Sequence, residues 1–438
     1  MRNVDTLIIG GGAVGCSTAY HLSLARRNSS EERYKCDGID ESPSIVVIEK
    51  DPTYAHASST LSAGGIRQQF SLKENVQMSL YGRDFIRSAK DTLFDCDAEN
   101  DNPIQFCEQG YLFLASTDEG RTKMVKNNKT QRDAGCDSIH ILNGRGEIRR
   151  KFPWMNCDDL VAASFGERGE GWFDPWALIR GLKASSEHLG VSFVHGVPIG
   201  AKRGPGGEII SVDVELYSTN GNKAVSRMTF NVNTVVNAAG AFASCVLDLL
   251  AGTDNPCQHP LPVRPRKRCI FFFHCAAPCG IPVLAPLTID PSGVYFRPEG
   301  GADSSTFICG VSPPPEEDFD CMDVGKLEVD HALFEERIWP ILYHRVPAFG
   351  DIKVKSSWAG LYEYNTVDQN AIIGFHPEIG NCLLLNGFSG HGLQQSPAVG
   401  LGASELIDHG KFLTLDLSSF SFQRFLDGGN LMYEEGIV

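Results

Sequence analysis

The sequence predicts an α/β fold with two units, a Rossmann-like domain built from separate segments and an inserted, mostly antiparallel β-sheet. Residues 4–27, VDTLIIGGGAVGCSTAYHLSLARR, contain an apolar strand, a glycine turn and a helix, and residues 44–50, SIVVIEK, form a second buried strand. A later apolar strand at residues 234–244, TVVNAAGAFAS, runs into small residues, which suits a return beside the first strand, with ordinary core packing as the alternative. The third observation is a set of β-branched, aromatic or alternating segments that predict the other sheet and a small sheet near the first domain: GYLFLAS, VSFVHGV, EIISVDVELYS and GVYFRPEGG.

Length and charge limit the classes of function. The chain has 438 residues, of which 42% are hydrophobic and 21% charged, as in globular proteins of two or three folding units. The net charge of −15 argues against nucleic-acid binding, although RPRKR at residues 264–268 is basic.

The fourteen cysteines favour reduced thiols, because the chain has no C-x-x-C pair and is too long for a disulfide-stapled miniprotein. Cys269, His274, Cys275 and Cys279 form the densest cluster, but their spacing matches no common zinc pattern. We interpret these cysteines as buried apolar residues and expect no metal site.

Residues 269–289 contain no formally charged side chain, which raises the question of a membrane span. Pro278, Pro282 and Pro286 argue against a continuous helix, and a strand, CIFFF, followed by a loop is the simpler interpretation. We expect peripheral membrane contact at most. Only three residues precede the first strand, so we expect no presequence or signal peptide in the chain as given.

The first strand, turn and helix with the second strand form a dinucleotide-binding βαβ unit. Gly10 serves the turn, Gly12 allows close approach to a pyrophosphate, Gly15 lets the helix pack on the strand, and Glu49 suits a ribose diol. The interval from Gly15 to Glu49 is long, and we interpret the polar residues 28–42 as a surface insertion between helix and strand.

A second glycine-rich helix entrance occurs at residues 387–400, GFSGHGLQQSPAVG. Gly387, Gly390 and Gly392 permit positive φ and close backbone approach, and a small-residue helix is expected from Leu393. No second G-x-G-x-x-G follows a strand, so we expect one bound dinucleotide and no separate nicotinamide domain. We interpret both glycine turns as contacts to one ligand.

Several motifs occur in an order that resembles FAD-dependent oxidoreductases of the D-amino-acid oxidase and sarcosine oxidase type. They are GGGAVGCSTAYHLS, SSTLSAGGIRQQF, GWFDPWAL, NAAGAFA, WAGLYEYNTVDQNAIIG and GFSGHG, and they cover nearly the whole chain. LSAGGIRQQFSLKENVQ, GWFDPWALIRGL, PRKR, RVPAF and GFSGHGLQQSP are closer to a mitochondrial member of this family that is associated with assembly of respiratory complex I.

The resemblance implies that both glycine turns bind one FAD, the early turn at the pyrophosphate and the late turn at the flavin ring. It also implies a discontinuous Rossmann-like FAD-binding domain over residues 1–90, 150–255 and 355–438, with a substrate domain over 91–149 and 256–354. The implied cofactor-binding residues are Gly10, Gly12, Ala13, Val14, Gly15, Glu49, Lys50, Ser59, Thr60, Ser62, Ala63, Gly64, Gly65, Ile199, Ala239, Gly240, Gly360, Gly387, Ser389, Gly390, His391 and Gly392.

Four positions depart from relatives in this family. Ser62 and Gly360 stand where a histidine or a cysteine attaches FAD covalently, so we expect non-covalent FAD. Ile308 stands where a lysine activates oxygen, and Gln394 stands where a lysine binds the substrate carboxylate. The resemblance therefore favours a dehydrogenase over an oxidase.

Arg67, Tyr362 and His391 are the candidate catalytic residues, with Arg297 and Gln394 nearby. Arg67 suits a substrate carboxylate and Tyr362 suits a hydrogen bond to it, or they are a surface arginine and a core tyrosine. His391 either fixes the flavin turn or acts as a base. The resemblance implies a mitochondrial FAD protein that supports complex I assembly, through complex I subunits or assembly intermediates. The alternative is an FAD-dependent dehydrogenase of a small N-methyl amino, amino or hydroxy acid.

Overall fold

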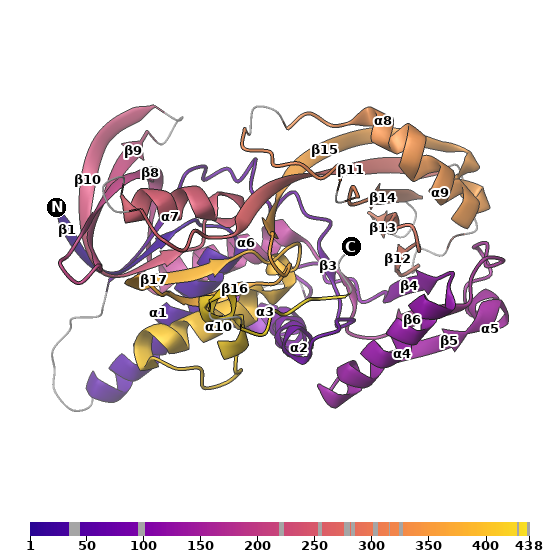
Figure 1. Ribbon diagram of the computed structural model, residues 1–438, viewed down its shortest axis with the longest axis horizontal. Coiled ribbons are helices and arrows are strands. Elements are labelled where there is room, and N and C mark those ends of the chain that lie inside the picture. The colour runs from indigo at the N-terminus through magenta and orange to yellow at the C-terminus, as the bar shows by residue number, and fades with distance from the viewer. Residues whose placement is uncertain are drawn as a thin grey trace.

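The computed structural model describes residues 1–34, 44–94, 101–218, 223–252, 256–275, 281, 285–300, 305–314, 316–323, 327–426 and 429–435. Two large sheets lie at opposite ends of the molecule, a seven-stranded sheet beside the N-terminus and an eight-stranded sheet on the right in Figure 1. A third, two-stranded sheet is formed by antiparallel pairing of β3 (Gly65–Ile66) with β7 (Gly171–Trp172).

The seven-stranded sheet has a parallel centre in the order β8-β2-β1-β10-β17, to which β16 is added antiparallel. Buried apolar residues fill these strands almost without interruption, as both faces of a parallel sheet require. The strands are β1 (Arg2–Ile9), β2 (Ile45–Glu49), β8 (Ser192–Arg203), β9 (Ile209–Tyr217), β10 (Ala224–Asn237), β16 (Ile372–His376) and β17 (Ile379–Asn386).

Side-chain alternation along β1 assigns its two faces. Ile8 packs with residues of α1 (Ala13–Tyr34) and α10 (Gly392–His409), whereas Leu7 and Ile9 pack with residues of α7 (Ala243–Ala251) and β9. The first and last long helices therefore cover the same face of the sheet, and they contact each other extensively (Figure 1). This packing brings the two glycine-rich turns, far apart in sequence, to one side of the sheet.

Strands β8 and β10 extend beyond the parallel centre. The first part of β8 pairs with β2 through His195, and from Gly196 onward β8 pairs antiparallel with β9, which also pairs with β10. VSFVHGV and EIISVDVELYS, which the sequence predicts as strands without assignment to either sheet, thus belong to an antiparallel extension of the seven-stranded sheet.

The eight-stranded sheet has the order β15-β11-β14-β13-β12-β4-β6-β5, and every pairing except β12 with β4 is antiparallel. The predicted α/β class with a mostly antiparallel second sheet is confirmed. Its strands are β4 (Tyr111–Ala115), β5 (Ile139–Asn143), β6 (Ala162–Gly166), β11 (Val263–Cys275), β12 (Leu287–Ile289), β13 (Tyr295–Glu299), β14 (Thr306–Gly310) and β15 (Ile352–Asn365).

The sheet boundaries differ from the expected domain ranges at two places. Strands β6 and β15 belong to the eight-stranded sheet, although residues 150–255 and 355–438 were expected in the nucleotide-binding domain. Antiparallel pairing of β11 with β15 runs from Val263 opposite Asn365 to Cys275 opposite Ile352, so the second sheet reaches the late glycine turn directly.

Seven further α-helices lie in the described part of the chain. They are α2 (Lys73–Arg87), α3 (Ala89–Leu93), α4 (Asp118–Asp133), α5 (Gly144–Lys151), α6 (Pro175–His188), α8 (His331–Leu333) and α9 (Trp339–Arg345). Among them, α2 packs on α10 and α6 packs on α1. Within the described ranges, no helix combines the length and apolar composition needed to cross a bilayer. CIFFF lies in β11 as predicted, whereas Cys279 and the prolines at 278 and 282 fall outside the described residues.

Helix α1 is longer than predicted. It continues through Tyr34, so the expected surface insertion at residues 28–42 begins inside the helix, and its remainder lies outside the described residues.

Candidate cofactor and active site

The early turn uses its three motif glycines in three different ways. Gly10 has φ +103°, and a Cβ there would lie 2.4 Å from the Ala238 carbonyl oxygen on the neighbouring chain segment. A Cβ on Gly15 would lie 1.9 Å from the Gly10 carbonyl oxygen. A Cβ on Gly12 would meet only the Ser59 hydroxyl, at 3.6 Å, so the space beside Gly12 is open for a ligand.

The N-terminus of α1 offers backbone donors at this open space. The Ala13 N–H donates to Ser59 Oγ at 3.4 Å, and the N–H groups of Gly12, Val14 and Gly15 have no acceptor among the described residues. Unsatisfied N–H groups at the positive end of a helix dipole are the usual binding site of a phosphate or pyrophosphate. These residues fit the pyrophosphate of a dinucleotide.

Glu49 lies at the end of β2, next to the early turn. Its Oε2 accepts from the Gly11 N–H and its Oε1 from the Asp51 N–H, both at 2.8 Å, and burial raises the pKa of the carboxyl. The Tyr54 hydroxyl lies near Gly11 and is buried without a hydrogen-bond partner. An orphaned donor beside a carboxylate suits the hydroxyl groups of a ribose.

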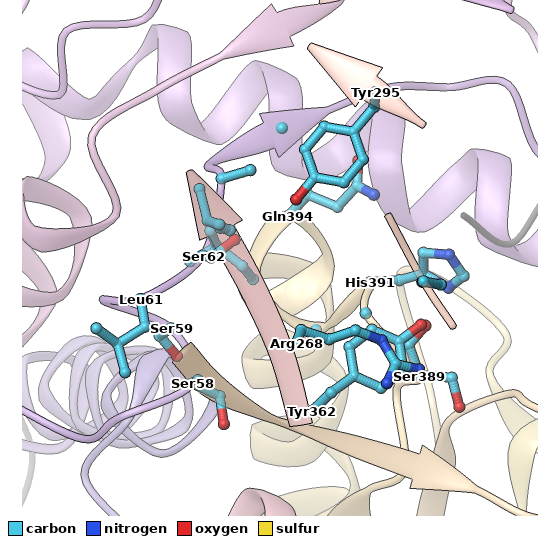
Figure 2. Close-up of a pocket in the computed structure, with 18 of the residues that line it drawn as sticks. Ser58, Ser59, Leu61, Ser62, Arg268, Tyr295, Tyr362, Ser389, His391 and Gln394 are labelled. Carbon is cyan, nitrogen blue, oxygen red and sulfur yellow. The ribbon is translucent and has the colours of Figure 1, made fainter. Parts of the chain in front are cut away.

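A cavity of about 220 Å³ lies between the loop after β2, the paired strands β11 and β15, and the start of α10. Figure 2 shows Ser59 and Ser62 on one side and Tyr362, Ser389 and His391 on another. Because its wall joins the two sheets, the cavity is where the late glycine turn meets the second sheet.

The late turn is held by side chains and backbone of β15. The Tyr362 hydroxyl donates to the Ser389 carbonyl, and the Asn365 N–H donates to Ser389 Oγ at 3.0 Å. Gly390 has φ +93°, and a Cβ there would lie 2.5 Å from the Tyr362 ring. The tyrosine that the sequence suggested for substrate therefore already uses its hydroxyl hydrogen on the turn.

Helix α10 begins at this turn and points its free donors at the cavity. The N–H groups of Gly392, Leu393 and Gln394 have no acceptor in the described part of the chain, and all three residues line the cavity. The helix has eighteen residues, so its positive dipole end is fully developed. This end fits a ligand edge that gains negative charge.

Arg67 and His391 form a buried pair in the cavity wall. Arg67 Nη2 lies 3.3 Å from His391 Nε2, and its Nη1 donates to the Gln69 carbonyl. A guanidinium only donates, so Nε2 accepts and the imidazole proton resides on Nδ1. Burial and the nearby Arg67 charge lower the pKa of His391 well below its usual range. This geometry favours a fixed hydrogen-bond donor over a base.

Arg268 is a cavity residue that the sequence did not single out. Its Nη1 and Nη2 donate to the Asp318 carboxylate at 2.7 and 2.9 Å, its guanidinium lies 4.5 Å from the Tyr362 ring, and its Nε is buried without a partner. The sequence did contain a signal for Arg268: Arg264, Arg266 and Arg268 occupy alternate positions of β11, so their side chains lie on one face of the strand.

Arg297 and Gln394 position other parts of the wall. Arg297 Nε donates to the Ala63 carbonyl at 2.9 Å, and Gln394 Oε1 accepts from the Arg67 N–H at 2.8 Å and from Ser79 Oγ at 3.0 Å. Gln394 therefore supports Arg67 from the position where relatives have a lysine.

Two carboxyl groups were also missed, the half-buried Glu363 and the buried Glu170. Glu363 lines the cavity on β15, and burial raises its pKa to about 8. Glu170 accepts from the Gln68 N–H and from Gln69 Nε2, and burial raises its pKa to about 7. Glu363 lies in the quoted motif WAGLYEYN, between Tyr362 and Tyr364. In a strand, an acidic residue between two tyrosines is also the pattern of an ordinary solvent-facing position, so the sequence did not mark Glu363 as a site residue.

The cavity brings together half of the predicted set, from both ends of the chain: Val14, Ser59, Ser62, Ala63, Gly65, Arg67, Gly360, Tyr362, Ser389, Gly390, His391 and Gly392. The other predicted residues do not line this cavity: Gly10, Gly12, Ala13, Gly15, Glu49, Lys50, Thr60, Gly64, Ile199, Ala239, Gly240 and Gly387. The first six of these surround the early turn.

Among the residues outside the cavity, Thr60 and Lys50 contact other residues, and Ile199 is exposed. Thr60 Oγ1 donates to the carbonyls of Tyr54 and Ala57. Lys50 is exposed, and its carbonyl is 3.0 Å from His195 Nε2. Ile199 is 37% exposed at the β8 irregularity between Pro198 and Gly200.

Three of the four departure positions, Ser62, Gly360 and Ile308, differ in exposure to the cavity. Ser62 and Gly360 both line it, and a Cβ on Gly360 would meet the Leu61 side chain at 3.1 Å. Ile308 is buried on β14 and does not line it. Hence neither wall position offers a histidine or a cysteine, and the β14 position offers no charge.

One group of metal-ligand side chains lies elsewhere, at Cys257, His376 and Glu378, whose ligand atoms lie within 4.8 Å of one another. His376 Nδ1 accepts from the Glu378 N–H and its Nε2 lies 3.2 Å from the His259 carbonyl, so both ring nitrogens are already engaged. Of the proposed cysteine cluster, Cys269 and Cys275 are buried strand residues.

The fold and site together define a two-sheet flavoprotein in which a parallel sheet binds the dinucleotide and an antiparallel sheet closes the cavity. The model of the family described as FAD dependent oxidoreductase matches residues 5–406, and the chain belongs to this family. Its bound cofactor is accordingly a flavin, which fits the donors at both helix N-termini.

Two known proteins and one solved structure are similar to the chain. It is 43% identical over 439 residues to FAD-dependent oxidoreductase domain-containing protein 1 of Xenopus laevis, covering 97% of this chain and 83% of the relative. Human mitochondrial sarcosine dehydrogenase is 23% identical over 96% of this chain and 41% of the relative. L-proline dehydrogenase from P. horikoshii superimposes with a TM-score of 0.77 at 22% identity, covering 98% and 99% of the chains, which shows the shared fold.

Proposed function

We propose that this protein is an FAD-dependent dehydrogenase of a small amino or hydroxy acid. The observation that carries the proposal is a cavity that joins the free N–H groups of α10 to a half-buried arginine, Arg268, whose Nε is buried without a hydrogen-bond partner. FAD supplies the hydride acceptor in such chemistry, and the protein supplies orientation and electrostatics.

Different cavity residues supply the orientation and the electrostatic stabilisation. The N–H groups of Gly392 and Leu393 stabilise negative charge that develops on the ligand edge they face. His391 keeps its proton on Nδ1 because Arg67 occupies Nε2, so it donates a hydrogen bond and does not remove a proton. Arg268 attracts the substrate anion, and Asp318 holds its guanidinium in place.

Substrate turnover tests this role directly. The flavin-loaded protein, mixed anaerobically with a series of N-methyl amino, amino and hydroxy acids, should lose its yellow colour with at least one of them. Arg268→Gln should raise the KM for that acid at least about tenfold, since a charge-assisted contact contributes roughly 1.5–3 kcal/mol. Arg264→Gln, an exposed arginine on the same strand, is the matched control.

A non-covalent FAD is part of the proposal. Ser62 and Gly360 support it, because neither side chain can bond to the flavin. Acid precipitation should release all yellow colour to the supernatant, and colour retained in the pellet would contradict this point.

The proposed electron acceptor is a quinone or an electron-transfer flavoprotein. Ile308 supports it, because it is uncharged where a related oxidase has its oxygen-activating lysine. Of the two guanidinium groups in the cavity wall, Arg67 is engaged by Gln69 and His391, and Arg268 is the one assigned to the substrate anion. Reduced protein should reoxidise in air far more slowly than with a quinone, and equal rates would reject a dehydrogenase.

A second candidate function is support of complex I assembly in mitochondria. The identity of 43% to FAD-dependent oxidoreductase domain-containing protein 1 over 97% of the chain favours it, whereas identity to sarcosine dehydrogenase is 23%. The two functions make different demands on Arg268. In cells lacking the protein, the flavin-loaded Arg268→Gln variant should restore complex I if assembly is the role, and should fail if turnover is required. Normal complex I in those cells, or the protein outside mitochondria, would reject the assembly role.

A further inference from the structure

Glu363 on β15 lies beneath the late glycine turn. Its Oε2 accepts from the Gly387 N–H at 3.1 Å, and its backbone carbonyl accepts from the Ser389 N–H at 3.0 Å. Its Oε1 has no hydrogen-bond donor among the described residues, and it would lie 3.2 Å from a Cβ on Gly392. The carboxyl group thus spans both ends of the turn from a cavity-lining position.

The charged groups around Glu363 face other directions. On β11, Arg266 and Arg268 stack on Tyr364 and Tyr362, which alternate with Glu363 and so lie on the opposite face of β15. The turn contributes His391, which is neutral, and η1 (Gly240–Phe242), which also contacts β15, contains no titratable side chain. Burial therefore has the largest effect on the pKa of Glu363 and raises it to about 8. The hydrogen bond from the Gly387 N–H acts in the opposite direction and is weaker.

The same carboxyl group lies beside the first residue of α10. The free N–H groups there stabilise negative charge, and a reduced flavin and an ionised Glu363 would both place negative charge near them. Two negative charges near one helix end repel each other, so charging one group favours protonation of the other.

We propose that Glu363 is a positioning residue for the bound flavin, and that its ionised carboxyl group takes up one proton when the flavin is reduced. This inference requires bound flavin but not turnover of any substrate, so it stands or falls separately from the proposed dehydrogenase activity.

In the titration, the electrode supplies two electrons to the bound flavin, which takes up one proton from the buffer with them. A second proton passes from the buffer acid to the Glu363 carboxylate and forms its O–H bond, which leaves the buffer base in solution. Below about pH 8 the carboxyl is already protonated, and only the flavin proton is taken up.

The experiment is a spectroelectrochemical titration of the flavin-loaded protein from pH 6.5 to 9.5. The wild-type potential should fall more steeply above pH 8, by about 30 mV per pH unit beyond the slope below pH 8, since a tenfold change in proton activity is worth that amount for one proton per two electrons. Glu363→Gln should remove the steeper segment. A wild-type slope that does not change near pH 8 would overturn the proposal.

Two further variants separate the proposal from a structural effect. Glu363→Asp should retain a steeper segment, with its onset shifted. Glu170→Gln, which changes the other buried carboxyl, should retain the steeper segment above pH 8, and its loss would assign the proton to Glu170 and overturn the proposal. The visible spectrum of oxidised flavin gives a second readout, because it should change with an apparent pKa near 8 in the wild type but not in Glu363→Gln.

Discussion

The two glycine-rich turns reach the same cofactor site by different physical means. In the early turn, backbone atoms leave no room for a side chain at two positions. A Cβ on Gly10 would clash with the Ala238 carbonyl just after β10, and a Cβ on Gly15 would clash with the Gly10 carbonyl. In the late turn, the close neighbours of Gly390 and Gly392 are side-chain atoms, the Tyr362 ring and the Glu363 carboxyl among them. The early turn is therefore fixed within one sheet, whereas the late turn takes its shape from a strand of the other sheet.

Because of this difference, residues of the eight-stranded sheet can influence the late glycine turn at the cofactor site. Strand β15 carries Tyr362 and Glu363 and is an edge strand of the eight-stranded sheet, next to β11 with Arg268. A change on β15 reaches the late turn directly through its hydrogen bonds to Gly387 and Ser389. Substitutions in the early turn should therefore act on folding or flavin binding as a whole, and substitutions at the late turn should act in graded steps.

The largest effect is expected for Gly15→Ala. The added methyl group would lie 1.9 Å from the Gly10 carbonyl oxygen, and backbone on both sides prevents a small adjustment. We expect a loss of at least about 3 kcal/mol in the free energy of unfolding, at the upper end for overpacking, measured by chemical denaturation. Gly146→Ala is the control, because no atom lies within 4 Å of its Cβ position. Equal stability of both variants would contradict the account of the early turn.

Gly12→Val should separate flavin binding from folding. Its side chain enters the open space beside Ser59, so the fold tolerates it while the pyrophosphate loses its place. We expect flavin affinity to fall at least about 100-fold, or roughly 2.7 kcal/mol, in the ratio of flavin absorbance to protein after dialysis. Far-ultraviolet circular dichroism should match the wild type. Retained flavin in Gly12→Val would place the pyrophosphate elsewhere.

The same contrast explains how far sequence alone predicted this molecule. The early turn and the α/β class were predictable, because the reasons for Gly10 and Glu49 lie in a local strand-turn-helix pattern. The partners of the late turn were not, because Tyr362 meets Ser389 only after β15 joins the second sheet. Arg67 was expected to bind a substrate carboxylate, but no local pattern revealed that Gln69 and His391 already engage its guanidinium.

A smaller, pH-dependent effect is expected at Glu363. Its pKa is about 8 in the folded chain and near 4.5 when unfolded, so between these values the folded state holds a proton that the unfolded state has lost. The free energy of unfolding should therefore fall as pH rises from 4.5 to 8, and stay level above 8. We expect a total of about 2 kcal/mol relative to Glu363→Gln, after solvent screening of this partly exposed group.

Thermal denaturation of wild type and Glu363→Gln across pH 5 to 9 measures this difference. Their melting temperatures should diverge up to pH 8, with Glu363→Gln the more stable at high pH. Parallel curves over the whole range would mean that the carboxyl group is solvated in the folded protein.

The smallest effect is expected for Tyr362→Phe, and it decides which role the hydroxyl has. The variant keeps the ring that packs on Gly390 and under Arg268, and loses only the hydrogen bond to the Ser389 carbonyl. We expect a loss of about 1 kcal/mol in stability and less than a tenfold loss in flavin affinity, because one neutral hydrogen bond is removed. Melting temperature and flavin dissociation measure both. If the hydroxyl instead binds substrate, as the sequence suggested, stability and flavin affinity should stay unchanged while the KM for the acid rises. Ser389→Ala provides the matched comparison, because it leaves the Ser389 carbonyl and the Tyr362 hydrogen bond in place and removes the hydroxyl that accepts from the Asn365 N–H and donates to the Gly387 carbonyl.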